Sequence, residues 1–585
     1  MTALDWIVVA VYVAGIVAYG SYFTRRASAS GDAYVVAGRK LPWWVVGIAD
    51  VASADGADAF WVTVIATGAM VGVHRFFWIG AVVSAPLGVL WSRYWRRLAL
   101  TSAAEIFEAR YDGVAASRFR GFFVAYGALF ANGIILAYVL RGFAQSMAPF
   151  LGWSGDTVLL VFAGATTLFT AVSGLLGVAY TDVPQFGALM LGRVLLAGTV
   201  LSLAGGFDGL MDRVVALRGH DFLAPYPPSR ADVHGEFGVD AASLVALALG
   251  GAFSVSTAQS YGVQRALAAR SVRDAALGQM LNAFLSLVAR IVPLSIIAFG
   301  CVALVPQAAP GDAWAALVRA HVGPGLLGLI LVGIVAGYLS TIDGFQNFIV
   351  AGLYNDLFAR HLRPRASERE RVWFLRGATL AVTLVSYLWA RVLIGRVDGA
   401  WINFIGSVLG LFALPAGLLR WIWWRMNIWG EVAAFALGAP LAWAVWFPLG
   451  FSRAPYWQGF AILFGVGLVT VVAVALATPP ESPAVLRAFY LRARPPGFWG
   501  PVRATLDAAT LAQVRGESRA DLVVALSGIA LCAAMVVGLG AVFARDRGLL
   551  VGCVAAAGVA AAVFYRAFVA AGVAGADATP ATPES

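Results

Sequence analysis

Apolar runs of about twenty residues alternate with short polar segments along most of the chain. A helix needs about 20 mostly apolar residues to cross a hydrocarbon core of about 30 Å, and about fifteen runs come near that length. The pattern predicts an all-α, polytopic membrane protein. The candidate spans lie at 5–23, 43–71, 76–95, 121–150, 157–174, 177–204, 241–262, 277–304, 325–358, 372–394, 400–424, 428–450, 456–477, 521–543 and 549–571.

The composition agrees with a lipid environment. Hydrophobic residues make up 61% of the 585 residues and charged residues 12%, against roughly a quarter charged in a soluble domain. The first run, Trp6 to Phe23, is followed by Arg25 and Arg26 instead of a small-residue cleavage site. We therefore expect a retained span and not a signal peptide.

The basic residues indicate how the chain is oriented. If the first helix runs inward, arginine and lysine concentrate in the inner loops, as at 25–40, 93–120, 360–371 and 487–503. Because cytoplasmic loops are enriched in positive charge, we expect an outside N-terminus and a cytoplasmic C-terminus in the cell (plasma or inner) membrane. The net charge of +10 is then a topology signal and predicts no nucleic-acid partner.

The second candidate span carries acids at membrane depth. Asp50, Asp55 and Asp58 surround Gly56 in an otherwise apolar run. An ionisable group there is costly, so its presence suggests a function. A break at this point would add free main-chain carbonyls, and both features favour a cation site. The alternatives are a solvated loop, or acids neutralised by Arg193 or Arg290 on neighbouring spans.

A second interruption, at Gly250–Ser260, lies in the span 241–262. Corresponding breaks in two halves of a membrane chain are typical of inverted repeats with a midplane site between them, although glycine-rich faces also serve for plain helix packing. Ser340 and Thr341, inside the span 325–358, offer adjacent hydroxyl oxygens for an alkali cation. Such hydroxyls also commonly bond to carbonyls of their own helix.

Three separated motifs resemble the sodium:solute symporter family: Gly38–Gly47 (GRKLPWWVVG), Ser173–Gln185 (SGLLGVAYTDVPQ) and Ser340–Asp343 (STID). The stretches Thr101–Tyr111 and Gln264–Ser271 support them. The resemblance implies a LeuT-like core of two inverted five-helix repeats, preceded by one extra helix and followed by about four more.

The resemblance also implies an ion site and an exit path. The sodium ligands would be main-chain carbonyls at the first break and oxygens of the span 325–358, and one aspartate would lie on the cytoplasmic path of the ion. By residue, these are the carbonyls of Ala52, Asp55 and Gly337, the hydroxyls of Ser340 and Thr341, and, for the path, Asp182.

A solute pocket beside the breaks is a further expectation. Asp58 is a candidate counter-ion for an amine or a proton, and Trp61, Phe253, Ser256 and Gln259 are candidate lining residues. Sugar-carrying members of the family place polar side chains on the broken helices. This chain has Ala54, Ala59 and Val255 there, which argues weakly against a sugar.

The function predicted from the residues is sodium-coupled symport of a small organic solute into the cell by alternating access, with Na⁺ as the coupling ion. The alternatives are a proton-coupled symporter, a sensor on the same fold or, at lower weight, a membrane-embedded transferase. The five histidines lie near span ends or in loops without ligand spacing or a nucleophile motif, so no enzyme is expected. Oligomeric state is left open.

Eight segments follow from these features. They are the extra N-terminal helix with its loop (1–42), the first repeat (43–204), an extracellular loop (205–240), the second repeat (241–424), additional helices (425–477), a cytoplasmic connector (478–520), a C-terminal helix pair (521–571) and a tail expected to be disordered (572–585).

Overall fold

The computed structural model describes residues 1–27, 36–53, 58, 61–63, 65–66, 79–225, 241–258, 261–309, 311–393 and 413–571. Within these ranges the regular structure is helical, and strand-like pairing is limited to two isolated bridges, Leu41 with Ala269 and Trp423 with Phe498. The all-α prediction is therefore confirmed. The tail at 572–585 lies outside the described residues.

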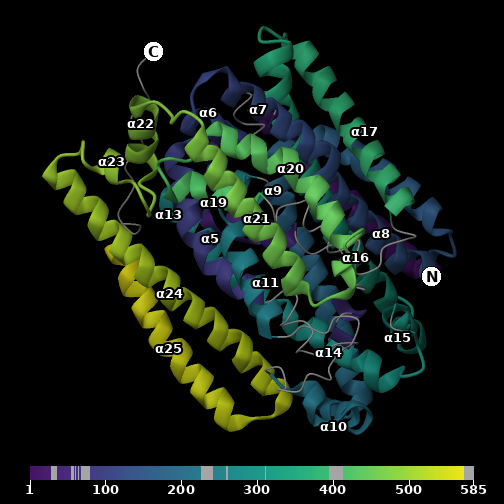
Figure 1. The fold of residues 1–585 in the computed structure, drawn as a ribbon. Coiled ribbons are helices and arrows are strands. Elements are labelled where there is room, and N and C mark those ends of the chain that lie inside the picture. Colours follow the sequence, from purple (N-terminus) through teal and green to yellow (C-terminus); the bar gives the residue numbers. More distant parts are fainter. Residues whose placement is uncertain are drawn as a thin grey trace.

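The described chain contains ten helices that are long and apolar enough to cross a membrane (Figure 1). The main elements are α1 (Ala3–Ala27), α3 (Trp43–Ala52), α5 (Ile79–Leu98), α6 (Ile106–Arg110), α7 (Gly113–Tyr126), α8 (Asn132–Leu151), α9 (Gly155–Ala204), α10 (Gly206–Arg218), α11 (Ala241–Ser254), α12 (Tyr261–Ala268), α13 (Val272–Phe284), α14 (Ile291–Leu304), α15 (Ala313–His321), α16 (Leu326–Gly352), α17 (Glu368–Leu393), α19 (Leu414–Ile422), α20 (Ile428–Trp446), α21 (Tyr456–Ala477), α22 (Pro483–Ala493), α23 (Gly500–Arg503), α24 (Ala508–Ala544) and α25 (Arg547–Ala570).

Four of these elements bear on the predicted helix breaks and spans. Helix α3 ends at Ala52, and α11 and α12 are separate helices on either side of 255–260. The expected spans 157–174 and 177–204 are joined in α9, whose 50 residues would extend about 75 Å if straight. Among the parts of α9 whose side chains the structure describes, Gly177–Ala204 has the length and apolarity of a span, and Gly155–Thr167 is a shorter apolar helix.

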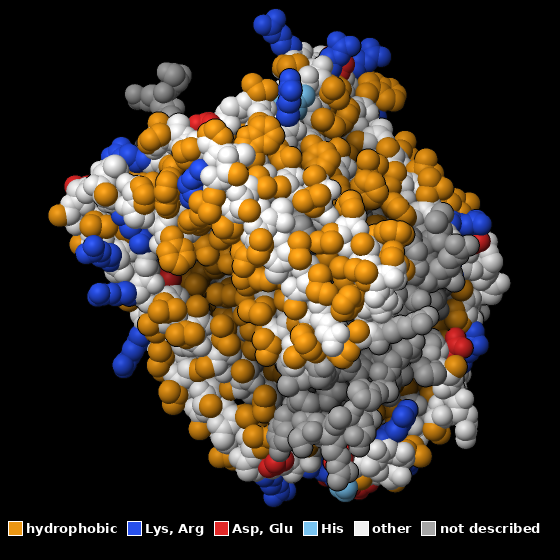
Figure 2. Space-filling model, in the orientation of Figure 1, with side chains coloured by type: hydrophobic (Ala, Val, Ile, Leu, Met, Phe, Trp, Pro, Cys, Tyr) orange, Lys and Arg blue, Asp and Glu red, His pale blue; other side chains and the backbone are white. Residues whose placement is uncertain are grey.

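Apolar side chains cover most of the visible surface, and lysine and arginine lie mainly around its rim (Figure 2). Peripheral helices expose large side chains: Val469 on α21 and Val551 on α25 are 68% and 69% exposed. A soluble protein rarely exposes apolar surface on this scale. The outer face is therefore suited to lipid, as expected of a multi-pass membrane protein.

The helices around the two breaks fall into two packed groups. Helices α3, α5, α11, α12 and α13 contact one another and are called the bundle below; α8, α9, α16 and α17 form the scaffold. Glycines allow close approach within the bundle: a Cβ on Gly47 would lie 2.6 Å from the Gly278 oxygen, and one on Gly251 would lie 2.3 Å from the Gly80 oxygen. Small residues serve this purpose in many membrane helices.

Helices outside the repeats are tied to the core by buried polar contacts. Asp5 of α1 accepts hydrogen bonds from the main-chain N–H groups of Gly325 (2.7 Å) and Gly328 (2.9 Å) at the start of α16, where the helix dipole favours an anion. The α24–α25 pair forms a hairpin along one side of the molecule (Figure 1), and Asp521 of α24 pairs with Arg93 of α5.

Candidate functional site

The end of α3 meets the middle of α16 in the protein interior. Ser53, the C-cap of α3, places its Oγ 3.0 Å from the Ala49 oxygen and 3.3 Å from the Ser340 oxygen. Ala52, Ser53, Ser340 and Thr341 are each 2% exposed or less. The two segments predicted to hold the cation, 287 residues apart at this contact, are therefore neighbours.

This junction is rich in oxygen atoms. The last carbonyls of a helix lack partners within it and carry the negative end of the helix dipole. In α16 the Thr341 hydroxyl donates to the Gly337 carbonyl (2.8 Å), and the Ser340 hydroxyl donates to Asp182 Oδ1 (2.5 Å). A hydroxyl that donates its hydrogen still has lone pairs for a cation. Asp55 lies outside the described residues.

Asp182 joins the bundle to the scaffold at this junction. Its second oxygen accepts a hydrogen bond from Arg265 of α12 at 2.9 Å, and the same guanidinium nitrogen donates to Ser53 Oγ at 2.6 Å. Asp182 and Arg265 are fully buried. One carboxylate therefore contacts both a proposed sodium ligand, Ser340, and a charged residue of the other helix group.

Arg265 and Ser53 were missed by the sequence reasoning as functional residues. Arg265 stands inside the stretch Gln264–Ser271 and shortly after the second helix break. A basic residue next to a break in a membrane helix needs a buried anion nearby, and that was the available signal. Ser53 gave none, because a serine between apolar residues on a helix usually bonds to its own backbone.

Asp58 forms an ion pair with the scaffold. Arg193 of α9 donates through Nε to Asp58 Oδ2 at 3.0 Å and through a second nitrogen to Oδ1. The two side chains are 5% and 1% exposed. Of the alternatives considered for the acids of this span, neutralisation by Arg193 is therefore the one observed for Asp58.

The other predicted solute residues contact different helices. Phe253 packs edge-to-face on Phe464 of α21, with ring centroids 4.8 Å apart. The Ser256 hydroxyl donates to the Phe253 carbonyl at 2.6 Å, and the Ser256 carbonyl accepts from Trp421 of α19 at 3.1 Å. Trp61 is half-buried against the scaffold core. Gln259 lies outside the described residues.

The protein has two helix groups that meet at discontinuous helices, and the junction between the groups is rich in oxygen atoms. This arrangement defines the class of protein: secondary transporters of the LeuT-like fold. The fold is similar to that of a Na⁺-coupled sialic acid symporter, with a TM-score of 0.68 at 20% identity, covering 82% of this chain and 99% of that one.

Sequence comparisons identify the family. A family model of the sodium:solute symporter family matches residues 34–438. The chain is 27% identical over 484 residues to the Bos taurus sodium/mannose cotransporter SLC5A10, covering 75% of this chain and 79% of the relative. It is 24% identical over 479 residues to the sodium/glucose cotransporter of Vibrio parahaemolyticus, covering 76% and 85%. The chain belongs to the sodium:solute symporter family.

The predicted function is confirmed at this level. The protein is a multi-pass membrane transporter that couples sodium to the symport of a small solute, and its coupling ion is Na⁺. The comparisons do not favour the proton-coupled and sensor alternatives. The family match ends at residue 438, so α21 to α25 lie beyond the matched region.

Proposed function

We propose that sodium binds at the junction of α3 and α16 and is released towards the cytoplasm past Asp182. The ligands are the carbonyls of Ala52, Asp55 and Gly337 with the hydroxyls of Ser340 and Thr341. The observation that carries the proposal is the contact between Ser53 and Ser340, because it brings the end of the broken helix to the hydroxyl pair in a buried setting.

In this proposal the ion acts by joining bundle and scaffold. Ala52 belongs to the bundle, and Ser340 and Thr341 belong to the scaffold. A cation held by both groups stabilises one position of the bundle relative to the scaffold. A solute that binds better in that position then binds sodium-loaded protein more tightly, and the solute strengthens sodium binding by the same factor. The membrane potential adds about 2.3 kcal/mol per charge per 100 mV to inward movement.

The proposed orientation has the N-terminus outside and the C-terminus in the cytoplasm. Arginines of segments far apart in sequence meet near the expected inner end: Glu517 pairs with both Arg97 and Arg494, and Glu108 pairs with both Arg120 and Arg360. This gathering of basic residues at one end supports the orientation through the positive-inside rule.

For the solute, we propose a small hydroxyl-bearing compound as the first class to test. Several relatives are named for mannose, glucose or myo-inositol. The apolar residues Ala54, Ala59 and Val255 argue against a sugar held by the broken helices themselves, so such a solute needs polar partners on other elements.

The test is uptake into proteoliposomes with an imposed sodium gradient. The double variant Ser340→Ala/Thr341→Ala should remove sodium-stimulated uptake while the purified protein keeps its folded, monodisperse form. The matched control is Ser386→Ala on α17, a buried serine whose hydroxyl, among the described residues, donates to the Val382 carbonyl of its own helix. If uptake by the double variant depends on sodium as in wild type, the proposed ion site is wrong.

A further inference from the structure

A stripe of exposed side chains runs along one face of α17. Leu380 and Leu384 are 61% and 57% exposed and stand four residues apart, so they share this face. Continued towards the start of the helix at 3.6 residues per turn, the same face carries Arg369, Trp373 and Arg376. All three are exposed. The stripe is therefore apolar along the membrane span and basic and aromatic at the end where the helix begins.

The depth of Arg376 in the membrane calls for an anionic partner. Arg391, near the other end of α17, follows Arg376 by fifteen residues, about 22 Å along a helix, whereas the hydrocarbon core is about 30 Å thick. A guanidinium inside the core is costly, so each of the two must reach a headgroup or an acid. Arg391 has an acid, because its Nη1 lies 3.5 Å from Asp156 Oδ2. Within the described residues, Arg369 and Arg376 form no ion pair.

The direction of helical side chains carries Arg376 towards the headgroups. Cα–Cβ bonds tilt towards the N-terminal end of a helix, and α17 begins at Glu368, whose side chain is 83% exposed. The long side chain of Arg376 can therefore extend back past Trp373 towards Arg369. The same tilt turns Arg391 towards the middle of the membrane, where it needs its acid partner. The two unpaired guanidinium groups thus come to one level, next to the exposed indole.

The acids nearest in sequence already have partners. Glu368 pairs with Arg371 at 3.2 Å, and Glu370 accepts hydrogen bonds from the Ser367 main-chain N–H (2.8 Å) and hydroxyl (2.9 Å). Residues 360–376 carry six arginines against these two glutamates. Basic side chains gather at the end of the molecule where α17 begins (Figures 1 and 2). This end of the helix therefore attracts an anion.

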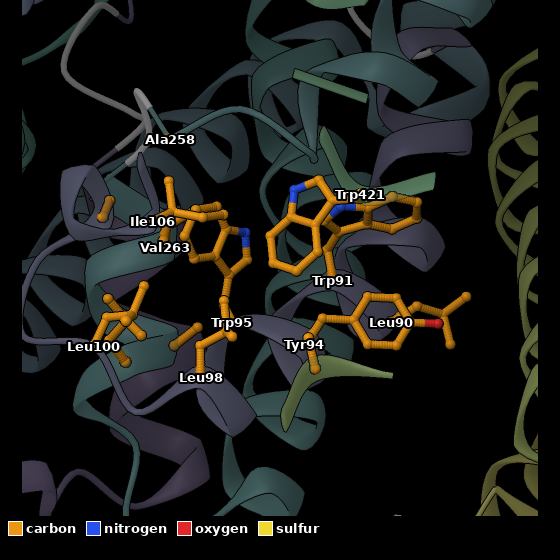
Figure 3. Close-up of a cluster of buried hydrophobic side chains, with 14 of the residues drawn as sticks. Leu90, Trp91, Tyr94, Trp95, Leu98, Leu100, Ile106, Ala258, Val263 and Trp421 are labelled. Atoms are coloured by element: carbon orange, nitrogen blue, oxygen red, sulfur yellow. The ribbon is translucent and has the colours of Figure 1, made fainter. Parts of the chain in front are cut away.

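The exposure of Trp373 indicates what kind of anion the site fits. The tryptophans of α5 are core residues: Trp91 and Trp95 lie beside Trp421 in a buried cluster (Figure 3) and are 7% and 1% exposed. Trp373 is 61% exposed, the highest value of any tryptophan among the described residues. Exposed tryptophan is typical of the headgroup level of a bilayer. Arginines and an indole at the end of an apolar stripe fit a lipid, which joins a charged head to apolar tails, better than a soluble anion.

From these features we infer that the exposed face at the start of α17 is a binding site for an anionic phospholipid. Arg369 and Arg376 contact the headgroup phosphate, to which a guanidinium can donate two parallel hydrogen bonds. Trp373 packs at the level of the lipid glycerol, and Leu380 and Leu384 lie along an acyl chain. This site goes beyond the proposed transport function and uses neither sodium nor solute. Only its assignment to the cytoplasmic leaflet rests on the proposed orientation.

The experiment measures lipid binding on purified, delipidated full-length protein in detergent. The probes are phosphatidylglycerol as an anionic phospholipid, phosphatidylcholine as a zwitterionic one, and glycerol 3-phosphate and inorganic phosphate as soluble anions, each titrated in a thermal-shift assay. Phosphatidylglycerol should raise the unfolding temperature at lower concentrations than phosphatidylcholine does, and the soluble anions should not raise it at those concentrations. Equal stabilisation by both phospholipids, or stabilisation by the soluble anions, would overturn the inference.

Variants then locate the binding. Arg369→Gln/Arg376→Gln should weaken phosphatidylglycerol affinity at least about tenfold, because each arginine near an anionic lipid contributes about fivefold. Arg369→Lys/Arg376→Lys keeps both charges and should keep most of the affinity. The matched control is Arg391→Gln, since Arg391 stands on the same helix and is 52% exposed but is paired with Asp156. Wild-type affinity in the glutamine double variant, or an equal loss in the control, would show that the lipid does not bind at this site.

A crosslinking experiment tests the same site in the wild-type protein, without any variant. A phosphatidylglycerol analogue with a diazirine in its acyl chain is bound and irradiated, and the labelled peptides are identified by mass spectrometry. Labels should fall within 373–388, and excess phosphatidylglycerol should remove them, whereas the same amount of phosphatidylcholine should not. Labels that avoid this segment, or equal displacement by both lipids, would contradict the site. The glutamine double variant should retain ²²Na⁺ binding, so a failure of this inference and a failure of the sodium site are distinguishable.

Discussion

Two buried arginine–aspartate pairs in this protein are alike in chemistry and differ in place. Arg265 and Asp182 join α12 of the bundle to α9 of the scaffold, and Arg93 and Asp521 join α5 to α24. All four side chains are at most 5% exposed. In the first pair, Arg265 also donates a hydrogen bond to Ser53, and Asp182 also accepts one from Ser340. In the second pair, Asp521 also accepts a hydrogen bond from the Tyr94 hydroxyl at 2.6 Å.

The position of a buried ion pair in the fold therefore determines its role. Removing one partner of such a pair leaves an uncompensated charge and is strongly destabilising. Arg265 and Asp182 connect the bundle to the scaffold. If alternating access moves these two groups against each other, we expect this pairing to change with the state of the transporter. Arg93 and Asp521 connect a bundle helix to the C-terminal hairpin, and their role is to hold the hairpin on the bundle.

The most direct test of this difference between the two pairs is to change each aspartate to asparagine. Asp182→Asn keeps the shape of the side chain but removes the charge that Arg265 faces and weakens the acceptor for Ser340. We expect sodium-dependent uptake to fall by more than about tenfold, a change equivalent to about 1.4 kcal/mol or more in ion binding. Measuring ²²Na⁺ binding and uptake together checks this, and wild-type sodium affinity would contradict it.

Asp521→Asn should act on stability alone, whereas Asp182→Asn, which also leaves a buried arginine without a charged partner, should lower both stability and sodium binding. Leaving Arg93 buried without a charged partner should cost about 3–5 kcal/mol, seen as a lower unfolding temperature of the purified protein. The folded fraction should keep its sodium dependence. Replacing both partners, as Arg93→Met/Asp521→Leu, should recover most of the loss because neither charge remains buried. A double variant as unstable as Asp521→Asn would show that the pair is not what anchors α24.

Some features of the fold could be predicted from the sequence, and the docking of the C-terminal hairpin could not. The all-α class and the helix breaks could be predicted, because hydrophobic run length and interruptions are local properties of the sequence. The hairpin at 521–571 was found as apolar runs, but its docking site was not predictable: Arg93 and Asp521 are 428 residues apart. The local sequence around either residue does not indicate that the other is its partner.

The candidate site was predictable to the extent that it is built from motifs. Ser340 and Thr341 lie in a short motif of the family, and Ala52 stands five residues after another, Gly38–Gly47. The structure brings the helices of these residues together. The solute residues had no such guide. Phe253 contacts Phe464 of α21, and Asp58 contacts Arg193 of α9, because side-chain direction in a bundle depends on the packing of several helices. Similarly, Asp50 on α3 and Trp91 and Trp95 on α5 line one cavity of about 420 Å³, which forms only when the helices pack.

A glycine at the sodium junction offers a test of intermediate size. A Cβ on Gly344 would lie 2.5 Å from Ser53 Oγ and 3.1 Å from the Arg265 guanidinium, so Gly344→Ala must displace the Ser53 side chain from its present contacts or push α3 away from α16. Overpacking of this kind costs about 1–3 kcal/mol, and we expect weaker sodium binding as well. Gly198→Ala on α9 is the control, since nothing lies within 4 Å of its Cβ position. Equal sodium affinity in both variants would mean that the junction is not close-packed around the ion.

The smallest expected effect lies one turn before Asp521. Glu517 pairs with Arg97 at 3.0 Å and with Arg494 at 2.9 Å, and the two arginine side chains are 17% and 28% exposed. Partly solvated pairs contribute about 0–1 kcal/mol, and Glu517 keeps one partner when the other is removed. Arg97→Gln should therefore lower the unfolding temperature much less than Asp521→Asn, and added salt should narrow the small difference from wild type. A loss of stability as large as that of Asp521→Asn would contradict the proposed role of the buried pair. It would show that the partly exposed charges around Glu517 hold α24 in place.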